Sequence, residues 1–352
     1  MSPLLLALAC TGGPDPQDSS PGAADGEGLF IAVPMLEPEA DGPGELRVYD
    51  QEGEVVWAAE PSGRIVTLQT RFAPDGSGLW VWTQDPVDGT AEVPFLLQHL
   101  DWSGQEIGRI EGFGHTAFAL LPDGGVLVLD KTLDEVQGQA ALIDQVVEYD
   151  ASGQRLGVVW TVTDDLDASE LVTVAQPSDK GLPVDWFHAN SLEVDERGHI
   201  FVSLSDVDAV VELDAQGQLV QGLDTQGYFV DHQPPDPPLE RPHSFEPLPD
   251  GGWLVFNRRV PEVAEFCSEA VELHLDSSGQ LVERGWSWHP EDCPKTTMLG
   301  SAHLLPEGRR LVSFGSAGRI VLLGPEDEIE LQIELSLGQA FGQPDWSTTP
   351  PG

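Results

Sequence analysis

Short stretches of alternating apolar and polar residues recur along the whole chain and are separated by turns that contain glycine. The stretches Glu45–Tyr49 and Ala209–Leu213 are typical of them. An alternation with a period of two predicts a β-strand with one buried face. In the turn that follows, Asp can cap the backbone with its side chain and Gly can take a positive φ, so the pattern predicts hairpins. The turn recurs at Asp50-Gln-Glu-Gly-Glu, Asp101-Trp-Ser-Gly-Gln, Asp150-Ala-Ser-Gly-Gln, Asp214-Ala-Gln-Gly-Gln and Asp276-Ser-Ser-Gly-Gln, with a degenerate sixth copy at Gly324-Pro-Glu-Asp-Glu.

A second turn precedes the first in most repeats and defines the repeating unit. Two turns that alternate with strands give a four-stranded antiparallel unit, and the units recur roughly every 50–60 residues, near the ~40–50 residues of a propeller blade. We therefore predict an all-β protein, a six-bladed β-propeller of four-stranded antiparallel blades. The second turns are Ala73-Pro-Asp-Gly, Leu121-Pro-Asp-Gly, Val194-Asp-Glu-Arg-Gly, Leu248-Pro-Asp-Gly and Leu305-Pro-Glu-Gly.

The propeller is expected to span residues 29–342, with the early strand 29–33 closing the ring by pairing with the last blade. Two repeats are longer than the others because they hold residues 163–183 and 225–242, which are rich in Pro, Asp and Gln. We predict that these insertions are loops over one face of the disc, where binding residues are often found.

The two ends of the chain differ from the propeller. Residues 1–10 are a short apolar run that ends in Cys10 and resembles a bacterial lipoprotein signal, in which the cysteine is lipidated. Residues 11–28 are predicted to be a disordered tether, and residues 343–352 a disordered tail. The protein is then an extracytoplasmic lipoprotein, in the periplasm or at the cell surface, that meets the membrane only through its lipid. The alternative is a cytoplasmic protein with a frayed apolar N-terminus.

Composition narrows the class of partner. The chain has 60 acidic residues against 16 Lys and Arg, a net charge of −44, so its surface repels phosphate backbones and nucleic-acid binding is excluded. Outside the cytoplasm, Cys267 and Cys293 are expected to form a disulfide. Neither belongs to a Cys-x-x-Cys pair, and no metal site is assigned.

Three of the nine histidines stand shortly before the strand that leads into the Pro-Asp-Gly turn. They are His115, His188 and His243. Because the first strand of each propeller blade lines the central channel, we expect the three imidazoles to face one another near the axis. His303 is closer to its turn and is expected outside that layer. The others, His99, His199, His232, His274 and His289, are expected at the surface or in packing roles.

The segments around these histidines resemble bacterial arylsulfate sulfotransferases. The similar segments are His188 with Asn190 before a strand, His243 through Leu-Pro-Asp-Gly-Gly-Trp-Leu-Val-Phe-Asn, and His115 before Leu-Leu-Pro-Asp-Gly-Gly. The resemblance implies an exported six-bladed propeller that transfers a sulfuryl group from an aryl sulfate to a phenol through a sulfohistidine, without a metal or a nucleotide sulfate donor. By position, His243 is the nucleophile, His115 and His188 bind the sulfuryl group or move protons, and Asn190 donates to its oxygens.

One position departs from that family. Where the family has an arginine in a Ser-x-Arg context, this chain reads Val202-Ser-Leu-Ser-Asp206-Val-Asp208. A carboxylate there repels a sulfate ester. Arg241 is the substrate-binding candidate in its place, with Arg258 and Arg259 as alternatives.

Two other functions remain open at this stage. A calcium-dependent propeller hydrolase or lactonase could bind its metal with Asp185, Asp206, Asp208, Asp231 and Asn190. A non-catalytic surface propeller could bind a partner through its long loops. Sequence motifs of serine hydrolases, P-loop proteins and zinc proteases are absent.

Overall fold

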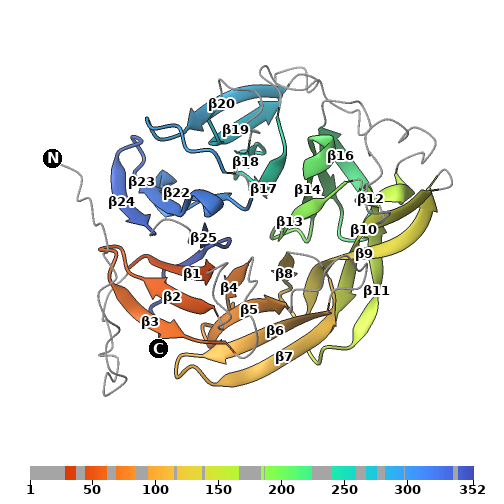
Figure 1. The fold of residues 1–352 in the computed structure, drawn as a ribbon, viewed down its shortest axis with the longest axis horizontal. Coiled ribbons are helices and arrows are strands. Elements are labelled where there is room, and N and C mark those ends of the chain that lie inside the picture. Colours follow the sequence, from red (N-terminus) through yellow and green to blue (C-terminus); the bar gives the residue numbers. More distant parts are fainter. Residues whose placement is uncertain are drawn as a thin grey trace.

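The computed structural model shows a ring of β-sheets (Figure 1). It describes residues 28–36, 44–61, 69–84, 94–114, 117–136, 139–165, 184–185, 187–223, 239–258, 267–275, 282–296, 298–335 and 340–352. Within these ranges the chain forms six blades, and its helical residues belong to one-turn 3-10 helices. No helix in the described ranges is long and apolar enough to cross a membrane. The prediction of an all-β, six-bladed propeller is confirmed.

Blades 2 to 6 are meanders of consecutive strands, and Figure 1 shows their first strands on the inner side of the ring. Blade 2 contains β4 (Thr70–Phe72), β5 (Gly78–Gln84), β6 (Pro94–Asp101) and β7 (Glu106–Phe113). Blade 3 contains β8 (Phe118–Leu120), β9 (Val126–Val136), β10 (Gln139–Tyr149) and β11 (Arg155–Thr161), with β12 (Val184–Asp185) added parallel to β10. Blade 4 contains β13 (Ala189–Val194), β14 (Ile200–Leu204), β15 (Ala209–Leu213) and β16 (Leu219–Leu223).

Blade 5 contains β17 (Pro242–Pro247), β18 (Trp253–Asn257), β19 (Glu269–Leu275) and β20 (Val282–Trp288). Blade 6 contains β21 (Ser301–Leu304), β22 (Arg310–Phe314), β23 (Arg319–Leu323) and β24 (Ile329–Glu334). The 3-10 helices are η1 (Val162–Asp164), η3 (Ser205–Val207), η4 (Pro306–Gly308) and η5 (Gly315–Ala317).

Blade 1 joins the two ends of the propeller. It contains β1 (Phe30–Leu36), β2 (Glu45–Tyr49) and β3 (Val55–Ala59), and its inner edge is completed by β25 (Ala340–Phe341) and β26 (Asp345–Ser347), which both pair with β1. The expectation that the first strand pairs with the last blade is wrong, because the C-terminal segment crosses into blade 1 instead. The expected disordered tail is also wrong, since this segment covers the free inner edge of β1.

Four of the predicted hairpin turns form as their chemistry requires, and the one at Asp276 lies outside the described residues. In the first of them, the side chain of Asp50 accepts hydrogen bonds from the backbone N–H groups of Glu52 and Glu54, at 3.1 and 2.8 Å. Gly53 has a φ of +81°, which a residue with a Cβ adopts at a cost. The same capping pattern recurs at Asp101, Asp150 and Asp214.

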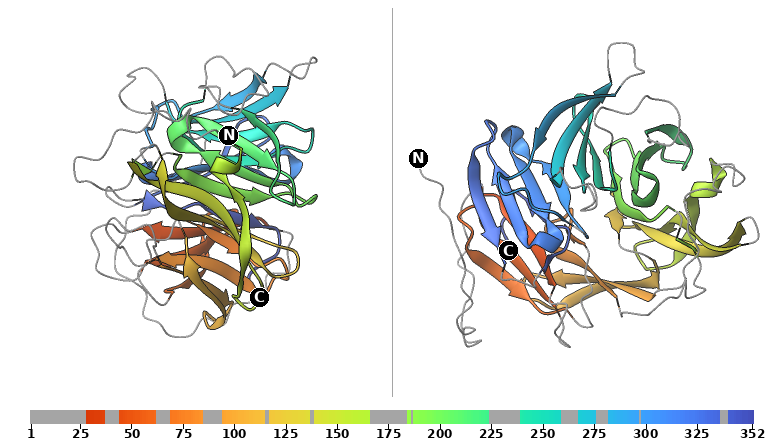
Figure 2. Two further views of the ribbon diagram at one scale, coloured as in Figure 1. Left: turned by 90° about the vertical axis from the view of Figure 1, so that its right-hand side faces the viewer. Right: turned by 45° about the horizontal axis from the view of Figure 1, so that its top comes forward.

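The hydrophobic core is divided among the contacts between neighbouring blades. The described residues form six buried clusters, and each contains side chains from two adjacent blades. The two views in Figure 2 show the blades as twisted sheets that face one another around the ring. Because every sheet is packed on both faces by its neighbours, the inner strands that lie near the axis are held rigidly.

The predicted disulfide between Cys267 and Cys293 is present, with the two Cα atoms 4.8 Å apart. It links the chain just before β19 to the loop after β20. The two predicted insertions lie mostly outside the described residues, which resume at β12 and at Leu239. Cys10 and the predicted tether also lie outside them.

Candidate functional site

The inner strands β13 and β17 each contain a bulge at the same structural position. The register of β13 against β14 shifts at Asn190, and that of β17 against β18 shifts at His243. Both side chains are buried. A bulge inserts one residue and re-aims its side chain, and bulges are common next to active sites. Blades 4 and 5 therefore present Asn190 and His243 as equivalent groups beside the axis.

Two positions before each bulge the backbone takes a left-handed conformation. His188 and Arg241 both have a φ of +51°, which is uncommon for residues with a Cβ. His188 is therefore structurally equivalent to Arg241, and Asn190 is equivalent to His243. The expectation that His188 and His243 occupy the same position in their blades is wrong, because His188 lies two residues before the bulge and His243 lies in it. The imidazole of His188 is still close enough to His243 to contribute to lowering its pKa. His115 lies outside the described residues.

His243 is held as a neutral imidazole. Burial, and then the positive charge of Arg258, lower its pKa to about 3. Its Nδ1 lies 3.0 Å from the carbonyl oxygen of Gly300, which can only accept a hydrogen bond, and 3.2 Å from the amide nitrogen of Gln343. The two hydrogens of that amide are directed at the carbonyl oxygens of Asn190 and His243, so Nδ1 carries the proton and donates to Gly300. The lone pair is then on Nε2, which has no hydrogen-bond partner among the described residues. A buried neutral imidazole with a free ring nitrogen is a competent nucleophile.

Asn190 is fixed by hydrogen bonds at both ends of its amide. Its Nδ2 donates to the carbonyl oxygen of Pro242 at 3.2 Å, and its Oδ1 accepts from the hydroxyl of Ser203 at 2.5 Å. The amide NH₂ carries two hydrogens, so one donor remains after the bond to Pro242.

Asp206, the residue that departs from the family pattern, is neutralised by Arg241. The Arg241 guanidinium donates to the Asp206 carboxylate, and the Arg241 backbone N–H donates to Asp208 at 2.7 Å. Arg241 was the substrate-binding candidate from the sequence. The structure instead shows it paired with the carboxylate that would repel an anionic substrate.

Because Asp206 pairs with Arg241, Arg258 is the cation whose charge acts on His243. It is 7% exposed, and no carboxylate of the described residues forms an ion pair with it. Its Nη2 is 3.4 Å from the hydroxyl of Ser205. Burial, and then the charge of Arg241, lower its pKa to about 10, so it remains protonated at neutral pH. A buried guanidinium without a carboxylate partner favours the binding of an anion. The charge of Arg258 also lowers the pKa of the neighbouring His243.

A set of charged residues lies behind His188, and two of them, Lys131 and Asp144, were not singled out in the sequence. Nδ1 of His188 is 2.8 Å from Oδ2 of Asp185, and the same carboxylate atom accepts a hydrogen bond from Nζ of Lys131. Asp144 is fully buried, with its Oδ1 3.9 Å from the same Nζ. The available signal was Lys131, which follows the apolar run Val126–Leu129 and Asp130 within β9.

A second charged layer lies deeper along the axis, on the same inner strands. Nδ1 of His303 on β21 is 3.0 Å from Oε2 of Glu246 on β17, and Arg71 on β4 forms an ion pair with Glu193 on β13. Arg71 also lies 3.8 Å from Asp345 on β26. His303 therefore lies outside the layer of His243, as predicted, and its partners are carboxylates of the protein.

The candidate calcium ligands do not converge. Asp185 contacts Lys131 and His188, Asp206 pairs with Arg241, Asp208 accepts from the Arg241 backbone, and Asn190 is fixed as above. Asp231 and Arg259 lie outside the described residues. No group of three His, Cys, Asp or Glu in the described ranges could hold a metal ion.

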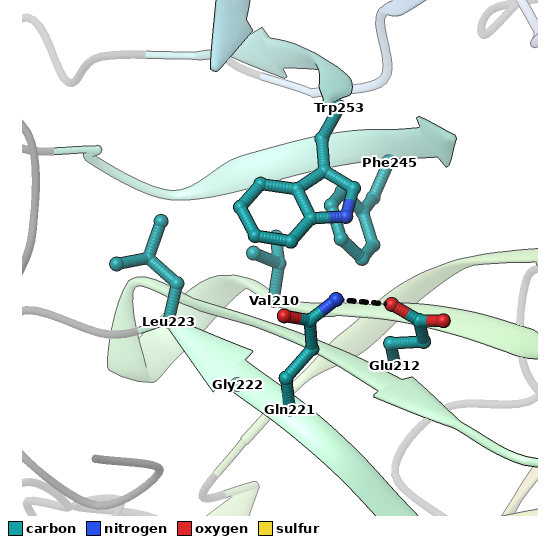
Figure 3. Close-up of a pocket in the computed structure, with 7 residues that line it drawn as sticks. All are labelled: Val210, Glu212, Gln221, Gly222, Leu223, Phe245 and Trp253. Atoms are coloured by element: carbon teal, nitrogen blue, oxygen red, sulfur yellow. Dashed lines mark hydrogen bonds between the residues drawn. The ribbon is translucent and has the colours of Figure 1, made fainter. Parts of the chain in front are cut away.

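A small pocket between blades 4 and 5 is separate from these residues (Figure 3). The indole of Trp253 covers it, and a hydrogen bond from Gln221 to Glu212 lies on its opposite side. None of the histidines or arginines described above lines it. The other lining residues are Val210, Gly222, Leu223 and Phe245.

Comparison with solved structures shows the same fold at low sequence identity. A protein of unknown function from Bacteroides caccae is 13% identical with a TM-score of 0.55, over 90% of this chain and 98% of that chain. A putative 6-phosphogluconolactonase from Bacteroides fragilis is 9% identical with a TM-score of 0.51, over 93% of this chain and 99% of that chain. At these identities the likeness concerns the fold alone. No curated protein matches the sequence.

Comparison with protein families is more specific. The profile of the family described as Arylsulfotransferase (ASST) matches residues 28–230. The match covers more than half of the chain, runs through β16 and includes His188 and Asn190. Together with the six-bladed fold, it shows that this chain belongs to the arylsulfotransferase family.

Proposed function

We propose that the protein transfers a sulfuryl group from an aryl sulfate to a phenol, with His243 as the nucleophile that carries the group between them. The observation that carries the proposal is the buried, neutral imidazole of His243 under the influence of Arg258, a cation that forms no ion pair with a carboxylate of the described residues. A sulfate ester needs a nucleophile and positive charge at the same place, and in the described residues they coincide here.

In the first half-reaction, Nε2 of His243 attacks the sulfur of the aryl sulfate. The Nε2–S bond forms while the bond between sulfur and the aryl oxygen breaks, and the bonding electrons leave with the phenolate. A proton donated by His188 converts that phenolate to a phenol. The carbonyl oxygen of Gly300 stabilises the positive charge that the His243 ring acquires, because it accepts from Nδ1–H at 3.0 Å.

In the second half-reaction, an acceptor phenol occupies the place of the first. His188, now neutral, takes the phenol proton as the phenolic oxygen attacks sulfur. The Nε2–S bond breaks and its electrons return to His243, so both histidines recover their starting states. The free amide hydrogen of Asn190 and the guanidinium of Arg258 are the groups proposed to bind the sulfuryl oxygens in both steps.

The test is turnover of a chromogenic aryl sulfate such as 4-nitrophenyl sulfate, with and without phenol. We expect release of nitrophenol that depends on the acceptor, and, without acceptor, an intact-protein mass increased by one sulfuryl group. His243→Ala should abolish both. His274→Ala is the matched control because His274 is on the outer half of the same blade, beside Asp250 and Glu272. Absence of release from the native protein would contradict the proposal.

We further propose that the enzyme works outside the cytoplasm, attached to the membrane through a lipid on Cys10. The disulfide between Cys267 and Cys293 supports this, because oxidised cysteine pairs persist in such compartments. Metabolic labelling with palmitate should mark the native protein and not Cys10→Ser. Equal labelling of the two would contradict the lipid anchor.

A further inference from the structure

Three charged residues, two of them buried, form a continuous group that ends at His188. Asp185 contacts His188 directly, Lys131 donates to Asp185, and Asp144 lies beside Lys131. The side chains of Lys131 and Asp144 are 5% and 1% exposed, whereas that of His188 is 33% exposed. The group therefore leads from the interior of blade 3 to an imidazole that a substrate can reach.

The architecture of blade 3 brings these residues together. Its strands β9 and β10 each have 11 residues, and Lys131 faces Asp144 across their ladder. The short strand β12 pairs in parallel with β10 and sets Asp185 opposite Leu142, two residues from Asp144. The left-handed backbone of His188 follows three residues later and returns its ring to Asp185.

The hydrogen bonds determine which nitrogen of His188 reacts. A carboxylate can only accept, so Nδ1 of His188 carries the proton that points at Asp185. Nε2 is on the other side of the ring, and we assign the proton exchange with the substrate to it. The ammonium of Lys131 favours the charged form of Asp185, whose pKa is lowered by its hydrogen bond to His188 and by Lys131 against the effect of burial.

Asp144 differs from Asp185 although it is close to the same cation. Neither of its carboxylate oxygens has a hydrogen-bond partner among the described residues. Burial raises its pKa, and the charge of Lys131 opposes that effect. Asp144 is thus the more distant carboxyl neighbour of the Lys131 ammonium, and it is protonated more readily than Asp185.

We infer that Lys131, Asp144 and Asp185 are positioning residues that hold His188 as the proton donor and acceptor of sulfuryl transfer. The inference rests on the proposed function. Asp185 stabilises the imidazolium that gives its Nε2 proton to the departing phenolate, and it keeps the neutral ring in the tautomer that accepts a proton from the incoming phenol. No other reactant is needed, since the proton lost in the first half-reaction returns in the second.

The charged groups around His188 come from several elements. Asp185 is on β12, Lys131 on β9 and Asp144 on β10, while His243 is on β17 and is neutral. The backbone N–H of Asp206, in η3, donates to the carbonyl oxygen of Phe187, the residue before His188. The Asp206 carboxylate, however, is paired with Arg241. Asp185 is therefore the carboxylate in direct contact with the ring.

The test compares two donors in Asp185→Asn. Phenyl sulfate releases a basic phenolate that needs a proton, whereas 4-nitrophenyl sulfate releases a stable one. We expect kcat with phenyl sulfate to fall on the order of 10²-fold and kcat with 4-nitrophenyl sulfate to fall less than ~10-fold. Lys131→Met should show the same asymmetry, to a smaller extent.

Two controls separate this role from a structural one. Asp292→Asn removes a surface partner of Arg319, and Lys295→Met removes an exposed cation, so both should match the native protein with either donor. Equal losses with both donors in Asp185→Asn, or no loss, would overturn the inference while the native activity stands.

An NMR measurement that requires no turnover tests the positioning role of Asp185 independently of the proposed function. In ¹H NMR spectra of the full chain, the Nδ1 proton between His188 and Asp185 should give a downfield, slowly exchanging signal. It should be present in the native protein and in His243→Ala, and absent from Asp185→Asn. If the native protein shows no transfer but has this signal, the proposed function fails alone. If the signal is missing, the positioning role fails.

Discussion

The side-chain nitrogen of Gln343 lies 3.2 Å from Nδ1 of His243, although 100 residues separate the two in sequence. The same nitrogen is 3.4 Å from the carbonyl oxygens of His243 and of Asn190. The C-terminal segment that completes blade 1 therefore also holds the two bulged residues of blades 4 and 5. The amide of Gln343 thus connects the segment that closes the ring to the geometry of the site.

Replacing Gln343 with Ala should weaken catalysis more than stability. The substitution removes donors to two buried carbonyl groups, which costs about 1–3 kcal/mol for each one left unsatisfied. We expect a lower kcat for aryl sulfate, because the His243 bulge is then free to shift, together with an intact fold. The measurements are steady-state kinetics and urea unfolding, with Gln332→Ala as the control, since the Gln332 side chain donates to Glu334 on the outer strand β24. Unchanged kinetics would show that the bulges hold their own shape.

Replacing Arg258 with Met should remove the positive charge at the site without creating a cavity. We expect KM for the aryl sulfate to rise and kcat to fall, since the guanidinium binds the sulfuryl oxygens in both the ground state and the transition state; kcat/KM should fall about 10²–10³-fold. Arg258→Lys should retain part of the activity. Arg319→Met is the control because Arg319 pairs with Asp292 at the surface. If Arg258→Met behaves like the control, Arg258 is not the anion-binding group.

The buried state of His243 predicts how stability depends on pH. Its pKa is about 3 in the folded protein and ~6.5 in the unfolded chain. As the pH falls from 6.5 towards 3, the unfolded chain takes up a proton that the folded protein does not, so this group's contribution is complete above 6.5 and is lost below it. The free energy of unfolding of the native protein should therefore decrease between pH 7 and 5 by up to about 1.4 kcal/mol per pH unit more than that of His243→Gln. Parallel curves for the two proteins, measured by urea unfolding, would contradict the burial of a neutral imidazole.

The disulfide between Cys267 and Cys293 should contribute about 2–4 kcal/mol to stability, because it closes a segment with a sequence separation of 26. The double variant Cys267→Ser with Cys293→Ser should lower the midpoint of guanidinium unfolding accordingly. Reductant should lower the midpoint of the native protein and leave that of the variant unchanged. A response of the variant to reductant would point to a different source of the effect.

The sequence by itself determined the repeat and therefore the fold class. Asp50 and Gly53 occupy turn positions whose chemistry is local, so the hairpins, the blades and their number could be predicted from residues close together in the chain. His188, Asn190 and His243 could also be singled out as candidates, because family resemblance follows short segments. The apolar pattern did not show which of these residues are structurally equivalent, because a bulge adds a residue to β13 and to β17 without changing that pattern.

Only the tertiary structure decided how the ring closes and which charges are paired. The three residues of β26 are too few to show an alternation, and their place follows from the free inner edge of β1. Asp206, Arg241 and Arg258 are ordinary charged residues in the sequence. The pairing of the first two and the isolation of the third come from their burial and from contacts across blades. Lys131 and Asp144 acquire a role for the same reason, because the energy of a charge depends on what surrounds it, and those surroundings exist only in the folded chain.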